Sequence, residues 1–143
     1  NFYKNDTLCK SQEYIYTDVI SASLIKYAIN CYLASKVIFF NELQDLFLKS
    51  NTNESWENFI TALSKDSRIG NSHMQVPGPD GRFGFGGACF PKDSRAFYEY
   101  SVLKDAPLNI LRKVIDINND IRSAYEIDTQ REKDQNIKFS PKN

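Results

Sequence analysis

Apolar residues recur along most of the chain at helical spacing, and one stretch stands out by its length. Between about Asp18 and Ser50 there is no glycine or proline, and apolar residues cover nearly the whole circumference of the predicted helix. At 1.5 Å per residue this helix would span roughly 45–50 Å. We therefore expect it either to form the central axis of the domain or to be covered by a second subunit. Asp18 or Thr17 can cap its start.

Three shorter helices are expected to support the long one. The first runs from about Glu54 to Lys65, the second from Pro91 to a break at 105–107, and the third from about 108 to 125. Their expected inward residues are Trp56, Phe59, Ile60 and Leu63; Ala96, Phe97, Tyr100 and Leu103; and Leu108, Leu111, Ile115, Ile121 and Tyr125. Apart from a possible short strand at 13–17, nothing suggests a sheet. The pattern therefore predicts an all-α fold.

The glycines are concentrated in one loop that ends at a cysteine. All six lie between Gly70 and Gly87, so backbone that can approach a ligand closely is gathered in one place. Cys89 follows, just before the helix expected to begin at Pro91, where the helix dipole and unpaired N–H groups favour a thiolate with a lowered pKa. Asp93 lies in the first helical turn. Together these features indicate a nucleophile site.

Composition narrows the class of protein. The 143 residues suit one domain, and 18 basic residues balance 18 acidic ones, so we expect no nucleic-acid partner. No apolar run is long enough to span a membrane, and we expect no signal peptide. Cys9, Cys31, Cys89 and the lone His73 lack the spacing of a metal site. We expect a reduced, cytoplasmic domain without a metal, in which His73 is a loop residue rather than a catalytic base.

Two segments of the chain resemble the UDP-glucose/GDP-mannose 6-dehydrogenase family. Residues 84–93 read Gly-Phe-Gly-Gly-Ala-Cys-Phe-Pro-Lys-Asp, and the family's active-site pattern is Gly-Phe-Gly-Gly-x-Cys-(Phe/Leu)-Pro-Lys-Asp. Residues 26–36 resemble its Lys-x-x-x-Asn-(Ala/Cys)-(Phe/Tyr)-Leu-Ala-x-(Lys/Arg), and 68–70 match an Arg-Ile-Gly triplet. Ser23 departs from the glutamate usual in the family. The resemblance covers about 17–122, the middle one of the family's three domains.

The resemblance implies a fold and roles for named residues. The fold would be a long central helix with supporting helices, like the C-terminal helical domain of 6-phosphogluconate dehydrogenase, with a glycine-rich active-site loop. Cys89 would be the nucleophile, and Asp93 would position or deprotonate water. The implied substrate-binding residues are Lys26, Asn30, Arg68, Gly78, Pro79, Asp80, Gly81, Arg82 and Gly86, of which Lys26 and Asn30 also reach the reacting carbonyl oxygen. Lys92 would lie near the phosphates of the NAD cofactor.

We therefore expect the central catalytic and dimerisation domain of an NAD-dependent nucleotide-sugar 6-dehydrogenase. It is most like those that convert UDP-glucose to UDP-glucuronate by two hydride transfers through a cysteine thiohemiacetal and thioester. Because no strand, G-x-G-x-x-G and helix occur in succession, NAD would be bound outside this chain. Residues 1–17 would be a junction to the missing NAD-binding domain, 18–130 the helical domain and 131–143 a disordered polar tail.

The expected partners are a UDP-sugar and a second copy of the chain, which would form a homodimer along the long helix. Two alternatives remain open. In the first alternative, the chain is a truncated, catalytically silent dimerisation module. In the second, it is a thiol-dependent enzyme that acts on another acceptor and borrows a separate nucleotide-binding chain.

Overall fold

The computed structural model describes residues 15–141, and over these residues the protein is helical. The helices are α2 (Val19–Lys49), α3 (Trp56–Ser64), α4 (Cys89–Leu103), α5 (Asn109–Ser123) and α6 (Gln130–Asp134). No strand forms within 15–141, which confirms the predicted all-α class. The possible strand at 13–17 is absent from its described part, 15–17, and Cys9 lies outside the described residues.

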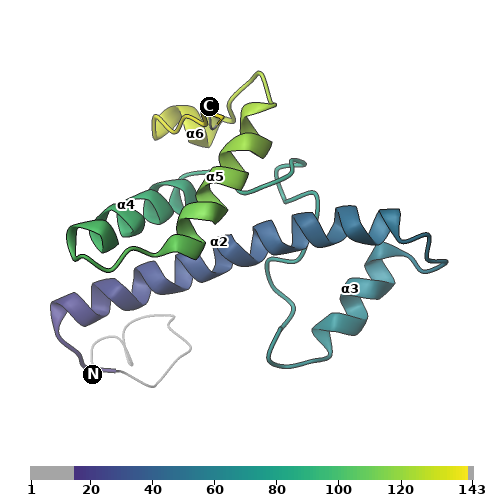
Figure 1. Ribbon diagram of the computed structural model, residues 1–143, viewed down its shortest axis with the longest axis horizontal. Helices are drawn as coiled ribbons and strands as arrows, with labels where there is room; N and C mark the ends of the chain where they lie inside the picture. The colour runs from purple at the N-terminus through teal and green to yellow at the C-terminus, as the bar shows by residue number, and fades with distance from the viewer. Residues whose placement is uncertain (1–14, 142–143) are drawn as a thin grey trace, which may run out of the picture.

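Helix α2 is the long axis on which the other helices are arranged (Figure 1). It begins after Asp18, whose Oδ1 accepts a hydrogen bond from the Ser21 amide at 2.9 Å, so the predicted cap is present. Helices α4 and α5 pack against α2 and against each other, while α3 folds back near the C-terminal end of α2 (Figure 1). The glycine-containing segment runs between α3 and α4.

Two clusters of buried apolar side chains hold these elements together. One joins α2, the segment before α4, and α5, and consists of Ala34, Ile38, Phe85 and Val114. The other joins α2 to α3 and the segment after it, and consists of Phe40, Trp56, Met74 and Val76. Because Phe85 lies in the first cluster, the glycine-rich segment is anchored in the core by a large side chain of its own.

Much of the apolar surface of α2 and α4 is not covered within the described chain. Tyr100 and Leu103 were expected to face inward, but Leu103 is 80 % exposed and Tyr100 also lies at the surface. An exposed apolar stripe runs along α2 at steps of four, three, seven and seven residues and consists of Ile25, Ile29, Tyr32, Phe39 and Leu46. Within residues 15–141, no helix is both long and apolar enough to cross a membrane.

The start of α4 differs from the sequence prediction. The helix begins at Cys89 rather than Pro91, so Cys89 lies in its first turn instead of before it. Ala88, the preceding residue, already has helical backbone angles and offers no side-chain cap. The sequence argument assumed that Pro91 would take the first helical position, yet proline is also tolerated elsewhere in the first turn because no N–H bond is lost there.

The expectation of a disordered tail at 131–143 is also corrected. Helix α6 starts with a capping box, in which Thr129 Oγ1 accepts from the Glu132 amide and Glu132 Oε2 accepts from the Thr129 amide. Glu132 is fully buried and pairs with Arg122. The tail is polar in composition, but this one buried contact holds its first part against the rest of the protein.

Candidate functional site

Asp93 is the centre of a polar cluster between α2 and α4. Its side chain is 1 % exposed. Its Oδ2 accepts a hydrogen bond from Asn30 Nδ2 at 2.7 Å and lies 3.5 Å from Lys26 Nζ, while its Oδ1 lies 3.2 Å from Lys92 Nζ. Lys26 and Asn30 are four residues apart on α2 and share a face, so one carboxylate reaches both. The structure therefore brings four of the predicted site residues together.

The surroundings of Asp93 keep it ionised. Burial alone would raise the pKa of its carboxyl group, because a buried carboxylate loses hydration. The hydrogen bond from Asn30 and the ammonium groups of Lys92 and Lys26 outweigh this effect, and the pKa of Asp93 lies below its ordinary value. The same contact with Asp93 raises the pKa of Lys92. Both lysine side chains remain more than half exposed, so their ammonium groups keep donors for a ligand.

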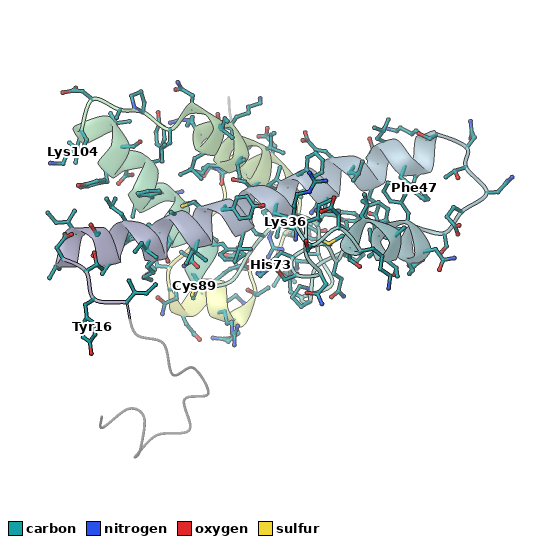
Figure 2. The ribbon with its side chains drawn as sticks, turned by 90° about the horizontal axis from the view of Figure 1, so that it is seen from below. Tyr16, Lys36, Phe47, His73, Cys89 and Lys104 are labelled. Carbon is teal, nitrogen blue, oxygen red and sulfur yellow. The ribbon has the colours of Figure 1, made fainter. Side chains whose placement is uncertain are left out.

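The two described thiols differ sharply in access. Cys89 is exposed and lies one helical turn before Asp93, whereas Cys31 on α2 is buried. Burial raises the pKa of Cys31 to about 11, and its Sγ donates to the Asp93 carbonyl oxygen at 3.9 Å. Figure 2 labels Cys89 and His73 on the same side of α2. Of these two thiols, Cys89 is the one that a reagent or substrate can reach.

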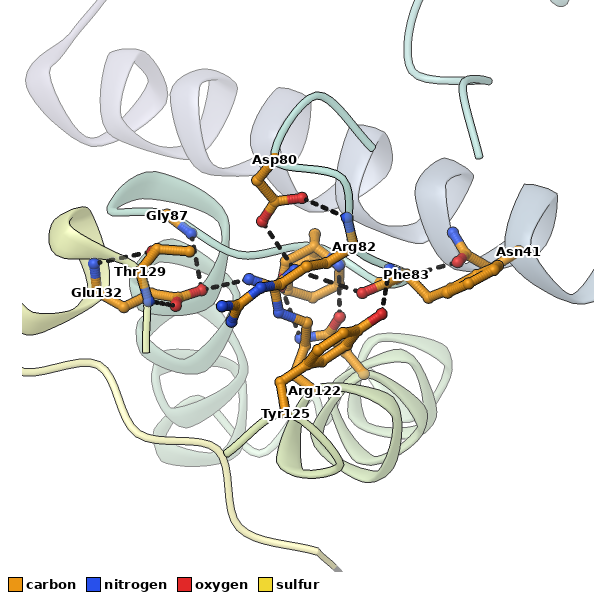
Figure 3. Close-up of polar contacts among 12 residues, drawn as sticks. Asn41, Asp80, Arg82, Phe83, Gly87, Arg122, Tyr125, Thr129 and Glu132 are labelled. Atoms are coloured by element: carbon orange, nitrogen blue, oxygen red, sulfur yellow. Dashed lines mark hydrogen bonds and ion pairs between the residues drawn. The ribbon is translucent and has the colours of Figure 1, made fainter. Parts of the chain in front are cut away.

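Side chains from α2 and α5 form hydrogen bonds with the glycine loop, residues 78–87 (Figure 3). The Gly84 amide donates to Asn41 Oδ1 at 2.9 Å. Phe85 exchanges two hydrogen bonds with Asn118, one from its amide at 2.7 Å and one to its carbonyl at 3.0 Å. Gly84 has a φ of +71°, and a Cβ there would come within 2.6 Å of Asn118 Oδ1, so this position requires glycine.

Arg122 provides a buried positive charge beneath the same loop. Its side chain is 1 % exposed. Its Nη1 donates to Asp80 Oδ2 at 2.8 Å and its Nη2 to Glu132 Oε1 at 2.5 Å. Burial would raise the pKa of Glu132, but hydrogen bonds from Thr129 and Arg122 lower it overall. The Gly87 amide also donates to Glu132 Oε1, at 3.3 Å.

Gly86 lies directly on this ion pair. A Cβ built at Gly86 would overlap Arg122 Nη2 and Glu132 Oε1. The absence of a side chain at this position is therefore explained by the scaffold behind the loop, in addition to any contact with a ligand in front of it.

A hollow of about 520 Å³ opens between the glycine loop and the start of α6. This volume is within the range of small-molecule sites in proteins. Its walls include four of the predicted substrate residues, Gly78, Pro79, Asp80 and Gly86. Thr129, Gln130 and Arg131 form part of the opposite side. His73 also lines the hollow, and its ring lies 5.5 Å from that of Phe90.

Three predicted substrate residues are placed elsewhere. Arg68 is exposed and forms an ion pair with Asp66, from Nη2 to Oδ2, at 2.5 Å. Gly81 closes a turn with a φ of +72°. The Arg82 guanidinium lies over the Tyr125 ring, 4.9 Å from its centroid. Within one copy of the chain, these residues line neither the hollow nor the Asp93 cluster.

The sequence argument missed the scaffold of the loop. Asn118 and Arg122 are polar residues four positions apart on the buried face of α5, and such isolated polar residues on an apolar face are a usable signal. Thr129 and Glu132 have the spacing of a capping box, which predicts a helix start. Neither signal reveals that Glu132 and Arg122 meet.

Comparison with known proteins identifies the family. Residues 20–120 match the model described as "UDP-glucose/GDP-mannose dehydrogenase family, central domain". The UDP-glucose 6-dehydrogenase of Rickettsia conorii is 39 % identical over 110 residues, which cover 74 % of this chain and 23 % of the relative. That of Rickettsia felis is 38 % identical over 106 residues, covering 74 % and 22 %.

A Bacillus subtilis relative, UDP-glucose 6-dehydrogenase YwqF, is 34 % identical over 103 residues, covering 72 % of this chain and 22 % of the relative. The chain thus spans between a fifth and a quarter of the length of the curated relatives it matches. The family match includes α2, the glycine loop and most of α5, and ends before α6. The chain belongs to the UDP-glucose/GDP-mannose dehydrogenase family and corresponds to its central domain.

Proposed function

We propose that this chain provides the cysteine-bearing part of an enzyme that oxidises the 6-hydroxyl group of UDP-glucose to a carboxylate with NAD. The observation that carries the proposal is the buried Asp93 carboxylate, which holds Lys26 and Asn30 against the helix that begins with the exposed Cys89. The names of the relatives, all UDP-glucose 6-dehydrogenases, support the choice of substrate.

The oxidation passes through an aldehyde, and Cys89 acts in its second half. The Cys89 thiolate adds to the aldehyde carbon, a C–S bond forms, and the carbonyl electron pair moves to the oxygen. Lys26 and Asn30 donate hydrogen bonds to that oxygen, since each keeps an N–H beyond those used by Asp93. Loss of hydride from the resulting thiohemiacetal gives a thioester, and water releases the carboxylate and the free thiol.

Asp93 takes a different part in this proposal from the one that its sequence context suggested. It was expected to position or deprotonate the attacking water. Its carboxylate is 1 % exposed and is occupied by Asn30, Lys26 and Lys92. We assign it the positioning of Lys26 and Asn30, which keeps their donors oriented toward the substrate oxygen.

NAD, when bound, accepts the hydride in both halves of the reaction. Lys92 is suited to one contact with it, because its side chain is more than half exposed and its ammonium group is tied only by the ion pair with Asp93, 3.2 Å away. A dinucleotide is otherwise held by a strand, a glycine turn and a helix, and residues 15–141 contain no strand. The cofactor would therefore be held mainly by a unit outside the described residues. A reducing compartment such as the cytoplasm suits the exposed Cys89 thiol.

The apolar stripe of α2 supports a homodimer. We propose that a second copy covers it through an isologous contact, because an exposed row of five large apolar side chains is unfavourable in water. Arg68 is exposed and contacts neither the hollow nor the Asp93 cluster within one copy, so we assign its substrate contact to the site of the second copy. The same stripe favours a second candidate function, a helical dimerisation module without catalysis. Such a module has no need of a buried carboxylate that orders Lys26 and Asn30.

The two functions are separated by following nicotinamide absorbance with UDP-glucose and NAD. The 143-residue chain is assayed alone and with the separately produced part of the Bacillus subtilis relative that lies outside the 22 % matched by this chain. We expect no reduction by the chain alone, sustained reduction by the mixture, and at most one NAD reduced per site, by the first hydride transfer, in the mixture that carries Cys89→Ser. Turnover that survives Cys89→Ser would contradict the proposed chemistry. A mixture that binds UDP-glucose but never reduces NAD would favour the silent module.

A further inference from the structure

Helix α6 lies beyond the residues that match the family model, yet it contacts the glycine loop (Figure 3). The family match ends at residue 120, and α6 occupies Gln130–Asp134. Its residues Gln130 and Arg131, with the cap residue Thr129, line the hollow in front of the loop. This segment therefore forms one wall of the hollow that four of the predicted substrate residues also line, and Cys89 lies just outside the lining, between Gly87 and Phe90 in sequence.

The Glu132 carboxylate joins three parts of the structure. Its Oε2 accepts from the Thr129 amide at 2.7 Å, which fixes the start of α6. Its Oε1 accepts from Arg122 Nη2 at 2.5 Å and from the Gly87 amide at 3.3 Å. Gly87 is two residues before Cys89, so this contact acts at the junction between the loop and the nucleophile's helix.

Arg122 extends the same contact to the other end of the loop. Its Nη1 donates to Asp80 Oδ2 at 2.8 Å and to the Phe83 carbonyl oxygen at 3.4 Å. Gly86 rests on the pair with no room for a Cβ. The loop between Asp80 and Gly87 is therefore supported along its length by one buried pair of opposite charges.

Stability alone does not account for such a pair. Removing two charges from water costs much of what their attraction returns, and well-packed apolar residues of similar volume often stabilise a protein as much or more. An apolar pair cannot accept the Gly87 N–H, donate to the Phe83 carbonyl or hold the Asp80 carboxylate. Those contacts order the loop, and they require the polar groups.

We propose that Glu132 is a positioning residue for the candidate site: through Arg122 and Gly87 it sets the conformation of the glycine loop and, with it, the approach of a nucleotide sugar to Cys89. The identity of the ligand rests on the proposed function above. The coupling of α6 to the loop rests only on the contacts among the described residues.

The experiment compares Glu132→Gln, a matched control and a charge-free pair in the complete 143-residue chain. The control is Asp134→Asn, which removes one negative charge from the exposed side of the same helix. The charge-free pair is Arg122→Met with Glu132→Met. It removes the polar contacts of both residues and does not leave the charge of either one buried without its partner. Amide hydrogen exchange is measured residue by residue by NMR, together with the melting temperature and the affinity for UDP-glucose.

We expect Glu132→Gln and the Met pair to speed exchange about tenfold or more at Phe85 and Gly87, as local opening of the loop becomes easier. Exchange in α3 should stay as in the wild type, and Asp134→Asn should change neither region. The affinity for UDP-glucose should fall both in Glu132→Gln and in the Met pair. In the Met pair the melting temperature should recover toward that of the wild type while loop exchange stays fast, which separates positioning from stability.

Three results would overturn the inference. They are loop exchange as slow as in the wild type in the Met pair, faster exchange spread equally over α3 and the loop, and unchanged UDP-glucose affinity in a variant whose loop exchange has risen. If the loop loosens as expected but the wild-type chain binds no UDP-glucose, the coupling of α6 to the loop stands and the proposed ligand fails.

Discussion

Replacing Asp93 by asparagine removes one charge from the centre of the polar cluster with almost no change in shape. The carboxylate now accepts from Asn30 at 2.7 Å and faces Lys26 and Lys92 at 3.5 and 3.2 Å. In Asp93→Asn one oxygen becomes an NH₂ group, which must point either at the Asn30 amide nitrogen or at a lysine ammonium. The new NH₂ group is buried and faces only donors, so it is left without an acceptor.

The expected loss of stability follows from the exposure of each partner. A hydrogen bond to a charged acceptor contributes about 1.5–3 kcal/mol. Each lysine is more than half exposed, so water screens its attraction and it adds at most about 1 kcal/mol. Because the new amide keeps part of the Asn30 bond, we expect Asp93→Asn to lower the free energy of unfolding by about 1–3 kcal/mol. Each 1 kcal/mol corresponds to roughly 3–5 °C in melting temperature for a chain of this length.

The pH dependence of this difference gives a sharper test. The folded pKa of Asp93 is lowered, so the wild type gains stability from it above the unfolded pKa of aspartate, about 3.9. That gain is lost as the pH falls through the lower, folded pKa. Thermal unfolding of wild type and variant, at one protein concentration and at pH values from 7 down to 3, should show a gap that is full near neutrality and narrows in acid.

Two outcomes would refute this reasoning. One is an Asp93→Asn protein as stable as the wild type at pH 7, which would mean that the buried carboxylate gains nothing from its partners. The other is a gap that stays constant to the lowest pH at which the fold persists, which would assign the loss to the replaced hydrogen-bond acceptor rather than to the charge.

Other consequences of the structure are open to simple measurements. Iodoacetamide should modify Cys89 before Cys31, because Cys31 is buried and burial raises the pKa of its thiol to about 11. The order is read by peptide mass spectrometry of the folded protein, and the reverse order would contradict the expectation. Gly86→Ala should lower the melting temperature more than Gly81→Ala. An alanine at position 81 has open space and costs only backbone strain of about 1–2 kcal/mol, whereas a Cβ at position 86 meets a buried ion pair. Equal shifts would contradict this expectation. Light scattering at micromolar concentration should report a dimer for the wild type and a monomer for Phe39→Lys, and a monomeric wild type would count against the proposed interface.

The long helix and its cap could be predicted because their signals are local. An uninterrupted run without glycine or proline, preceded by Asp18, needs no tertiary information to indicate α2. The shared face of Lys26 and Asn30 follows in the same way from their four-residue spacing. The family resemblance placed Asp93 at the same site, and the structure shows that its buried carboxylate contacts both.

The contacts that the sequence argument missed join distant or weakly patterned segments. Glu132 lies in a stretch whose composition is that of a solvated tail, and its burial depends on a buried arginine ten residues earlier. Leu103 shows the opposite error. Its helical spacing indicated an inward face, but spacing describes the pattern of one helix and does not reveal whether anything packs against it.

The role of Cys89 as the nucleophile is tested most directly by NMR with the 6-aldehyde of UDP-glucose, labelled with ¹³C at C6. No cofactor is needed, because addition of the thiolate to the aldehyde precedes hydride transfer. We predict a resonance from a thiohemiacetal carbon when the wild-type chain is added, and none with Cys89→Ala. Identical spectra for the two proteins would contradict the assignment of Cys89 as the residue that attacks the substrate.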